Sequence, residues 1–142
     1  MLPDDKLIIW RNDIYYTNEN GITNMSTLFK TNIICGSYIG DGDENRSINL
    51  GVTPYCIFLF GEDGASFTNI GGGSTNVTYG GFAFKNHPVY SSLYARYEAL
   101  SITSNGFSVH NKSSYDLGIY ASTNKNDTNN GHQYTYYYCV IY

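Results

Sequence analysis

The chain has 142 residues, a formal net charge of −4 and only 14% charged residues, against about 25% in an ordinary soluble domain. This length and an aromatic content of 16% fit one folded domain rather than a disordered chain. Eight Lys and Arg residues scattered among twelve acids argue against a nucleic-acid partner, because phosphate binding needs clustered basic side chains.

The sequence contains no segment that predicts a membrane span. Its longest apolar run, Cys56–Phe60, is far shorter than the roughly 20 residues that a spanning helix needs. The first residues, Met1–Lys6, carry acids where a secretory signal has a basic patch and an apolar stretch. We therefore expect no membrane insertion and no export by the usual route.

The first 30 residues differ from the rest and predict a separate segment. Two strand-like runs, Lys6–Trp10 and Ile14–Thr17, flank a short polar turn and predict a β-hairpin. Two strands alone are marginally stable in water. We therefore expect segment 1–30 to lean on the remaining domain, residues 31–142, or on a neighbouring copy.

Residues 31–142 predict an almost all-β domain, because β-branched and aromatic residues dominate the apolar runs and helix formers are few. Short strands separated by turn residues are typical of a sandwich or a barrel. The predicted strands are Thr31–Ile39, Arg46–Leu50, Tyr55–Phe60, Leu100–Thr103, Phe107–His110, Leu117–Ser122 and Tyr134–Tyr142. The last has few polar positions, so we expect it in the centre of a sheet, covered on both faces or covered on one by a partner subunit.

Two polar segments between these strands predict exposed loops. Gly40–Asn45 contains the Asp-x-Asp-x-Asn spacing that opens a calcium loop, but it lacks the Gly and Glu that an EF-hand needs at its sixth and twelfth positions. A polar hairpin loop is therefore the preferred interpretation. The second loop, Ser122–Gln133, leads into the final strand.

The sequence pattern predicts no strand in the segment Gly61–Tyr97. An unstructured stretch of that length inside a compact domain is usually either functional or wrongly assigned. Its glycine clusters lack the Lys-Ser/Thr and the helix of a phosphate-binding loop, so they predict flexible loops or close approaches of the backbone. Within this segment, Ser91–Glu98 predicts one or two helical turns.

Three widely spaced cysteines, Cys35, Cys56 and Cys139, lie in apolar or aromatic runs. They predict buried thiols in core strands, because free Cys behaves as a small hydrophobic residue and no metal or redox spacing is present. A reactive or ligating role is the alternative. Free thiols in turn predict folding in a reducing cytoplasm.

The sequence predicts no catalytic residue, no metal site and no cofactor. It has no Gly-x-Ser-x-Gly motif, and no pair of acids stands out for glycoside hydrolysis. His87, His110 and His132 lack the spacing of metal ligands. An enzyme is therefore the minority hypothesis.

Uncharged hydrogen-bonding residues are the positive signal, since Asn, Tyr, Gly, Ser and Thr supply half of the chain. Tyr offers rigid amphipathic contact area and Asn and Ser offer adaptable hydrogen bonds, as in binding loops. Sugars present apolar ring faces and hydroxyls to such groups, although each tyrosine in or beside a predicted loop is equally well explained as a core or interface residue. The candidate glycan contacts, in or beside predicted loops, are Tyr79, Tyr90, Tyr94, Arg96, Asn111, Tyr115 and Asn124.

The order of motifs from Cys35 onward resembles the C-terminal domains of phage tail-fibre and receptor-binding proteins. The motifs are a Gly-rich turn within Cys35–Gly42, an Arg-x-Ile-x-Leu-Gly-x-x-Pro segment and apolar strand within Arg46–Phe60, Gly80–Phe84, Leu100–Val109 and the Tyr-rich final strand. The same order of strands is similar, more weakly, to snail-agglutinin-type (H-type) lectins.

This resemblance implies an antiparallel sandwich of about six core strands that forms a homotrimer, with segment 1–30 as a neck that joins other virion proteins. It implies a non-catalytic fibre tip that binds a host cell-surface polysaccharide or glycan, belongs to the virion and is assembled in the bacterial host cytoplasm. A structural head-fibre, decoration or trimerisation domain is the first alternative. A polysaccharide-degrading tip is the second.

Overall fold

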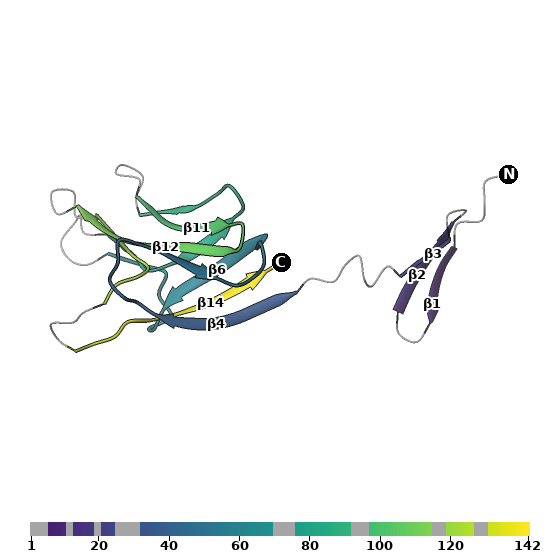
Figure 1. Ribbon diagram of the computed structural model, residues 1–142, viewed down its shortest axis with the longest axis horizontal. Helices are drawn as coiled ribbons and strands as arrows, with labels where there is room; N and C mark the ends of the chain where they lie inside the picture. The colour runs from purple at the N-terminus through teal and green to yellow at the C-terminus, as the bar shows by residue number, and fades with distance from the viewer. Residues whose placement is uncertain are drawn as a thin grey trace. The chain divides into compact units, whose positions relative to one another are not determined.

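The computed structural model describes residues 6–10, 13–18, 21–24, 32–69, 76–91, 97–114, 119–126 and 131–142. Every regular element in these ranges is a β-strand and none is a helix, which confirms the all-β prediction. None of the described residues therefore belongs to a helix that could cross a membrane. The chain divides into two compact units, Met1–Asn32 and Ile33–Tyr142 (Figure 1), whereas the sequence pattern places the boundary after residue 30.

The first unit is a three-stranded antiparallel sheet in the order β1-β2-β3. Its strands are β1 (Lys6–Trp10), β2 (Asp13–Asn18) and β3 (Gly21–Asn24). β1 and β2 form the hairpin that the two apolar runs predict. β3 was not predicted, and it brings the sheet to the three strands at which small sheets begin to be stable.

The second unit contains a four-stranded antiparallel sheet in the order β4-β14-β6-β9. Its strands are β4 (Ile33–Ile39), β6 (Cys56–Gly61), β9 (Gly81–Phe84) and β14 (Thr135–Ile141). β14 is hydrogen-bonded to β4 and to β6, which confirms its predicted central place. Only one of its faces is covered within this unit, because Tyr136 and Val140 are buried whereas Tyr137 is exposed.

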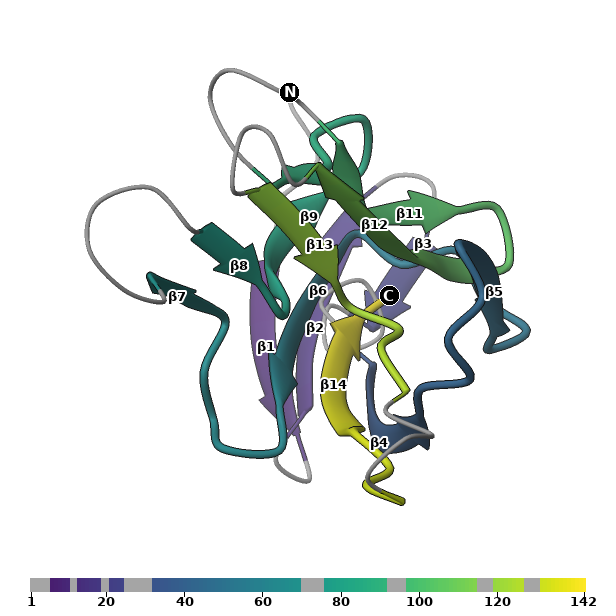
Figure 2. The same cartoon turned by 90° about the vertical axis from the view of Figure 1, so that its left-hand side faces the viewer.

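The other sheet of the second unit has seven strands in the order β10-β11-β12-β13-β8-β7, with β5 paired to β12 beside that path. All of its strand pairs are antiparallel except β8 with β13. The two sheets curl into a half-barrel (Figure 2). The seven strands are β5 (Asn45–Asn49), β7 (Phe67–Asn69), β8 (Asn76–Thr78), β10 (Val89–Tyr90), β11 (Glu98–Thr103), β12 (Gly106–Ser114) and β13 (Ile119–Ser122).

The hydrophobic core lies between the four-stranded sheet and strands β11 and β12. Side chains alternate between the two faces of a strand, so every second residue of these strands points inward. Burying each large apolar side chain stabilises the fold by about 1.5–3 kcal/mol. The core residues are Tyr38, Ile57, Leu59, Ala83, Leu100, Phe107, Val109, Tyr136 and Val140.

The sequence pattern predicts no strand in the segment Gly61–Tyr97, but the structure places β7, β8, β9 and β10 there. These strands are two to four residues long, too short to show a period of two. One glycine marks a close approach, because a Cβ on Gly80 would lie 2.1 Å from the Leu59 carbonyl oxygen. The helical prediction for Ser91–Glu98 is wrong at Glu98, which begins β11, and residues 92–96 lie outside the described residues.

The polar loop Ser122–Gln133 is not exposed throughout, because Ser122, Thr123 and Asn124 are buried. Two buried phenols hold this stretch. The rings of Tyr38 and Tyr136 stack with centroids 5.1 Å apart, and their hydroxyls donate to the carbonyls of Thr123 and Ser122 respectively. The prediction of an exposed loop was wrong here because polar residues are buried only where hydrogen-bond partners are present, and the sequence does not show these partners.

Two of the three cysteines form a disulfide, contrary to the expectation of free buried thiols. Cys35 in β4 and Cys139 in β14 are register partners with Cα atoms 4.1 Å apart, and Cys35 is exposed. Cys56 is a buried free thiol, as predicted. The spacing of cysteines along the sequence does not show which residues are opposite each other in paired strands, so the sequence did not predict the Cys35–Cys139 pair. Since structural disulfides persist in oxidising surroundings, the argument for a reducing compartment is lost.

Candidate binding site

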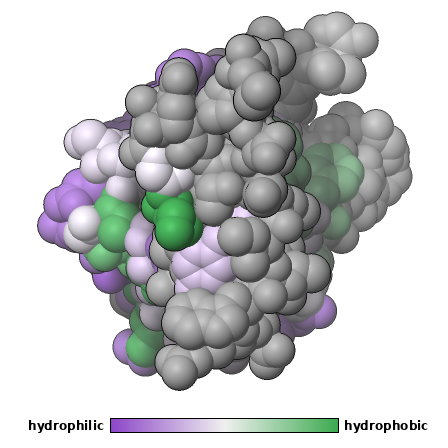
Figure 3. Space-filling model, turned by 90° about the vertical axis from the view of Figure 1, so that its right-hand side faces the viewer, coloured by the Kyte–Doolittle hydropathy of each residue, from purple (hydrophilic) through white to green (hydrophobic). Residues whose placement is uncertain are grey.

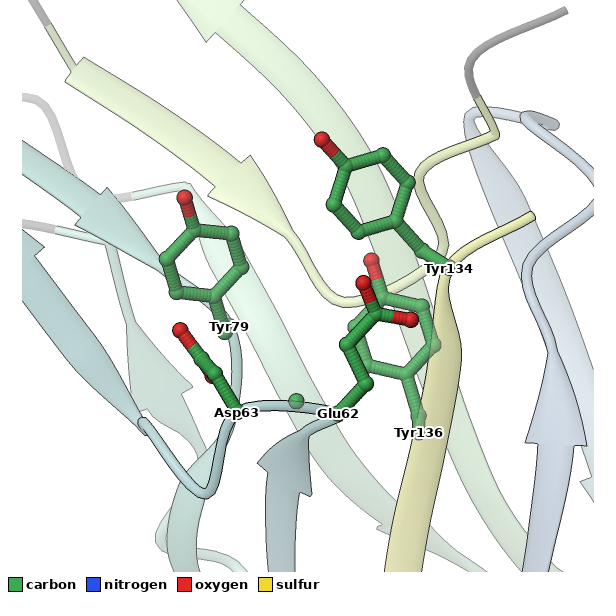
Figure 4. Close-up of a pocket in the computed structure, with 6 residues that line it drawn as sticks. Glu62, Asp63, Tyr79, Tyr134 and Tyr136 are labelled. Atoms are coloured by element: carbon green, nitrogen blue, oxygen red, sulfur yellow. The ribbon is translucent and has the colours of Figure 1, made fainter. Parts of the chain in front are cut away.

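A small pocket opens where the end of β6 meets the residues before β14. Tyr79 and Asp63 lie on one side of it, and Glu62, Tyr134 and Tyr136 lie on the other (Figure 4). Its cavity volume is about 70 Å³, which is roughly the volume of two water molecules. The pocket can therefore take one substituent of a larger ligand, and the rest of that ligand must lie across its mouth.

A tight turn after β6 positions both carboxylates of the pocket. The Gly61 N–H donates to the Ala65 carbonyl at 2.8 Å, and the Gly64 N–H donates to the Gly61 carbonyl at 2.9 Å. Gly64 has a φ of 78°, a conformation that favours glycine. Asp63 Oδ1 accepts the Ala65 N–H at 2.9 Å, which closes an Asx turn. The turn thus fixes the acidic pair Glu62 and Asp63 at the rim.

Glu62 ties this turn to the beginning of β14. Its Oε2 accepts the Thr135 N–H at 3.1 Å, and its Oε1 is bonded to His132 Nε2. The hydrogen bond from Thr135 and then that from His132 lower the pKa of Glu62. The Glu62 side chain is therefore an ionised acceptor at neutral pH, with its orientation set from two sides.

The three tyrosines of the pocket supply hydroxyl groups and aromatic walls. Tyr136 is buried, and its hydroxyl donates to the Ser122 carbonyl at 2.6 Å and accepts the Lys125 N–H at 3.0 Å. Desolvation raises the pKa of Tyr79, which is half-buried. Tyr134 is half-buried, and Lys125 Nζ lies 4.7 Å from the centre of its ring. Aromatic surface and carboxylate acceptors thus meet at one pocket.

Among the predicted contacts that the structure describes, Tyr79 alone lines this pocket. Tyr90 is exposed on the edge strand β10 and is not among the lining residues. Asn111 and Asn124 lie together at a different place, the loop after β4. The remaining predicted contacts lie outside the described residues, and they are Tyr94, Arg96 and Tyr115.

Asn124 is buried, and its amide braces the loop after β4. Its Nδ2 donates to Asp41 Oδ1 at 2.5 Å and to the Asp43 carbonyl at 3.0 Å, and its Oδ1 accepts the Asp41 N–H at 3.3 Å. The Asn111 Nδ2 donates to the Gly42 carbonyl of the same loop at 3.1 Å. Both amides are engaged within the protein, so we leave them out of the candidate site.

The Asp41 carboxylate is engaged by protein groups, which agrees with a polar loop rather than a calcium loop. Its Oδ2 lies 3.2 Å from Arg46 Nε, and its Oδ1 accepts the Asp43 N–H at 3.0 Å. Desolvation raises the pKa of this carboxyl, but hydrogen bonds from Asn124 and Asp43 and the charge of Arg46 outweigh it and lower the pKa. Within the described ranges, no group of three or more His, Cys, Asp or Glu side chains could hold a metal ion.

Five of the six lining residues are absent from the predicted contacts, and they are Glu62, Asp63, Tyr134, Tyr136 and Gly61. A signal for the first two was present, because Gly-Glu-Asp-Gly directly after an apolar strand is a turn carrying two acids. Tyr134 was counted with the final strand, but it precedes β14. The pocket itself depends on the pairing of β6 with β14, which no local pattern reports.

A second depression in the same unit is larger but chemically less suited to a sugar. Its cavity volume is about 240 Å³. None of its lining side chains is aromatic, so it offers no ring on which a sugar face could pack. Its lining residues are Thr53, Lys85, Asn86, Ile102, Thr103 and Ser104.

Comparisons of the chain with protein-family models, with curated proteins and with solved structures found no match. The functional argument therefore rests on the chemistry of the pocket and of the surface.

Proposed function

We propose that the chain is a non-catalytic carbohydrate-binding domain that recognises a host cell-surface glycan, in the manner of a phage tail-fibre tip. The observation that supports this proposal best is the pocket at which Tyr79 and Tyr134 stand beside the Glu62 and Asp63 carboxylates. Binding sites combine apolar and aromatic surface with a few placed polar groups. The motif order from Cys35 to the final strand supports the tail-fibre assignment.

In this proposal one hydroxyl-bearing substituent enters the pocket and donates a hydrogen bond to the Glu62 or Asp63 carboxylate, whose lone pairs are not all used by their bonds within the protein. The sugar ring lies across the mouth and packs against the ring of Tyr79 or Tyr134. A site of this size binds weakly, so several copies on one particle would raise the avidity. The proposed assembly is a homotrimer of two-layered sandwiches with about six core strands, joined to other virion proteins through the first unit.

Binding of the purified chain to host capsular or cell-wall polysaccharide, measured by calorimetry and on a glycan array, tests this function. Tyr79→Ala should weaken binding about three- to tenfold, because an aromatic contact contributes roughly 0.5–1.5 kcal/mol beyond its buried area. Tyr79→Phe keeps the ring and should retain most of the affinity. Lys85→Ala, in the second depression, is the matched control and should bind like wild type.

Two results would contradict the proposal. The first is a wild-type chain that binds none of the polysaccharides of its host surface. The second is a loss of binding in Lys85→Ala with unchanged binding in Tyr79→Ala, which would move the site to the second depression.

A structural role as a head-fibre, decoration or trimerisation domain is the second candidate. The exposed apolar side chains on the four-stranded sheet favour it, since they form a surface that assembly would bury. Cell adsorption by an assembled protein that carries Tyr79→Ala separates the two functions. Normal adsorption would favour the structural role.

A polysaccharide-degrading tip is supported less well by the described residues. A glycosidase needs a general acid whose pKa is raised, whereas the bonds from Thr135 and His132 lower the pKa of Glu62. Release of reducing ends from host polysaccharide by the purified chain would favour this third candidate.

A further inference from the structure

The four-stranded sheet turns one face to the core and the other, which we call the outer face, away from it. Side chains alternate along each strand, so the odd-numbered residues of β4 and β14 share the outer face with the even-numbered residues of β6 and β9. Figure 3 shows hydrophobic and hydrophilic residues next to one another on the side of the molecule that it draws. The large exposed side chains of the outer face are Ile33, Ile39, Phe58, Phe82, Phe84 and Tyr137.

The outer face is continuous, because strand register sets its side chains in rows. Cys139 lies between its partners Cys35 and Phe58, and Phe58 is in turn paired with Phe82. The rings of Phe58 and Phe82 stack with centroids 4.2 Å apart, and Phe84 meets Phe82 edge-on at 4.3 Å. One row thus runs from the disulfide to the stacked rings across all four strands.

The composition of the outer face is that of an interface core. No charged side chain occurs among its described positions, and its hydroxyl groups are those of Ser37, Thr135 and Tyr137. Interface cores are depleted in charge and enriched in aromatic residues, and homodimer interfaces are more apolar than contacts between separately stable partners. A second copy of this chain fits such a surface better than a transient partner of another kind.

The area of the outer face matches what association of two copies requires. Its six large side chains are each between 41% and 62% exposed. Because a large side chain offers about 150–250 Å², these six alone leave roughly 600 Å² accessible. Each partner of a standard interface contributes about 800 Å², and the half-buried neighbours on the same face supply the difference.

We propose that the outer face is a self-association interface that a second copy of this chain covers in solution. The same surface on each copy supplies the contact, which therefore relates two chains by a twofold axis and is separate from the contacts within the proposed homotrimer. Like charges do not oppose the contact, since the face carries none. The inference rests on the sheet alone and does not depend on glycan binding.

Analytical ultracentrifugation of the full chain over a range of concentrations tests this interface. Wild type should sediment as a multiple of its 15.9 kDa monomer. Tyr137→Lys places a charge on the central strand of the outer face and should weaken association about thirtyfold or more, the effect of losing an interface hot spot. Phe67→Lys is the matched control, because Phe67 is 56% exposed on β7 of the other sheet. It should leave the mass unchanged.

Two measurements keep the test decisive if Tyr137→Lys does not fold. Circular dichroism reports whether the variant is folded, and the Tm of wild type should rise with protein concentration if folding is linked to association. A monomer at every concentration, with a constant Tm, would overturn the proposal. A monomer whose outer face is nevertheless protected from hydrogen exchange would assign the face to the first unit of the same chain, which overturns it equally.

Discussion

Thr123 and Asn124 are fully buried polar residues whose side chains form hydrogen bonds with neighbouring strands and with the loop after β4. Thr123 Oγ1 accepts the His110 N–H at 2.8 Å and donates to the Ala99 carbonyl at 2.7 Å. The amide of Asn124 joins three groups of the loop after β4. Buried polar groups cost stability only where they lack partners, so these bonds fix the segment after β13 to β11 and β12 and to the loop after β4.

Asn124→Ala should lower the free energy of unfolding by about 2–3 kcal/mol, because it removes several buried hydrogen bonds and leaves their partners unsatisfied. Asn111→Ala is the matched control, and the loss of its side-chain bond to Gly42 should cost about 1 kcal/mol. Urea unfolding followed by fluorescence measures both. A folded Asn124→Ala protein that loses glycan affinity without losing stability would restore Asn124 as a ligand contact.

At the scale of elements, the first and last strands of the second unit are neighbours. β4 and β14 pair over seven register partners, from Ile33 with Ile141 to Ile39 with Thr135, and the disulfide crosses between them. β14 is also paired with β6, so its place does not depend on the covalent bond. We therefore expect the disulfide to stabilise the unit without defining its topology.

Reduction of the Cys35–Cys139 disulfide, or the double substitution Cys35→Ser and Cys139→Ser, should lower the free energy of unfolding by about 2–4 kcal/mol, because the bond closes a long loop in the unfolded chain. Denaturant unfolding with and without reductant measures the loss. Cys56→Ala removes the free thiol, and the reductant effect should persist in it. Three titratable thiols in native, unreduced protein would contradict the pairing.

The sequence predicted those strands that consist of a sustained apolar run. β1 has the bounds of its predicted run, Lys6–Trp10, and β14 occupies the predicted central place. The short strands β7 to β10 were missed because two to four residues carry no periodicity. For the pocket, Tyr79 was predicted from its loop. Glu62 and Tyr134 were not, because only the pairing of β6 with β14 brings their segments together.

At the scale of the whole molecule, several ionisable groups of the described residues form local pairs. Lys112 Nζ lies 2.9 Å from Glu44 Oε1, and Arg46 lies beside Asp41. The hydrogen bond and the charge of Lys112 lower the pKa of Glu44. The charged partner of each carboxylate lies close to it. The pKa of each carboxyl therefore depends more on this partner than on the net charge of −4.

The stability of the chain should fall on acidification in two stages. Desolvation lowers the pKa of His110, so the unfolded chain binds a proton first and stability declines as the pH falls below about 6.5. The groups around its ring are Glu98, Lys112, Glu44 and Asn45. The pKa values of Asp41, Glu44 and Glu62 are also lowered, so their contributions are present above about pH 4.5 and are lost as the pH falls through their folded values.

Thermal melting at a series of pH values measures this profile. His110→Gln should flatten the decline between about pH 6.5 and 5 and leave the lower stage unchanged. A wild-type Tm that rises as the pH is lowered through 6.5 would show that the pKa of His110 is raised in the folded state and would contradict the prediction.

The disulfide between the first and last strands also decides how the second unit would carry a pulling force. Tension applied to the backbone before Cys35 and after Cys139 passes through the sulfur–sulfur bond, so the 104-residue separation between them is removed from the load path. A force between the chain before Cys35 and a ligand held in the pocket has two covalent routes. One runs forward to Glu62, and the other crosses to Cys139 and runs back to Tyr134. The load is thus shared between two strands.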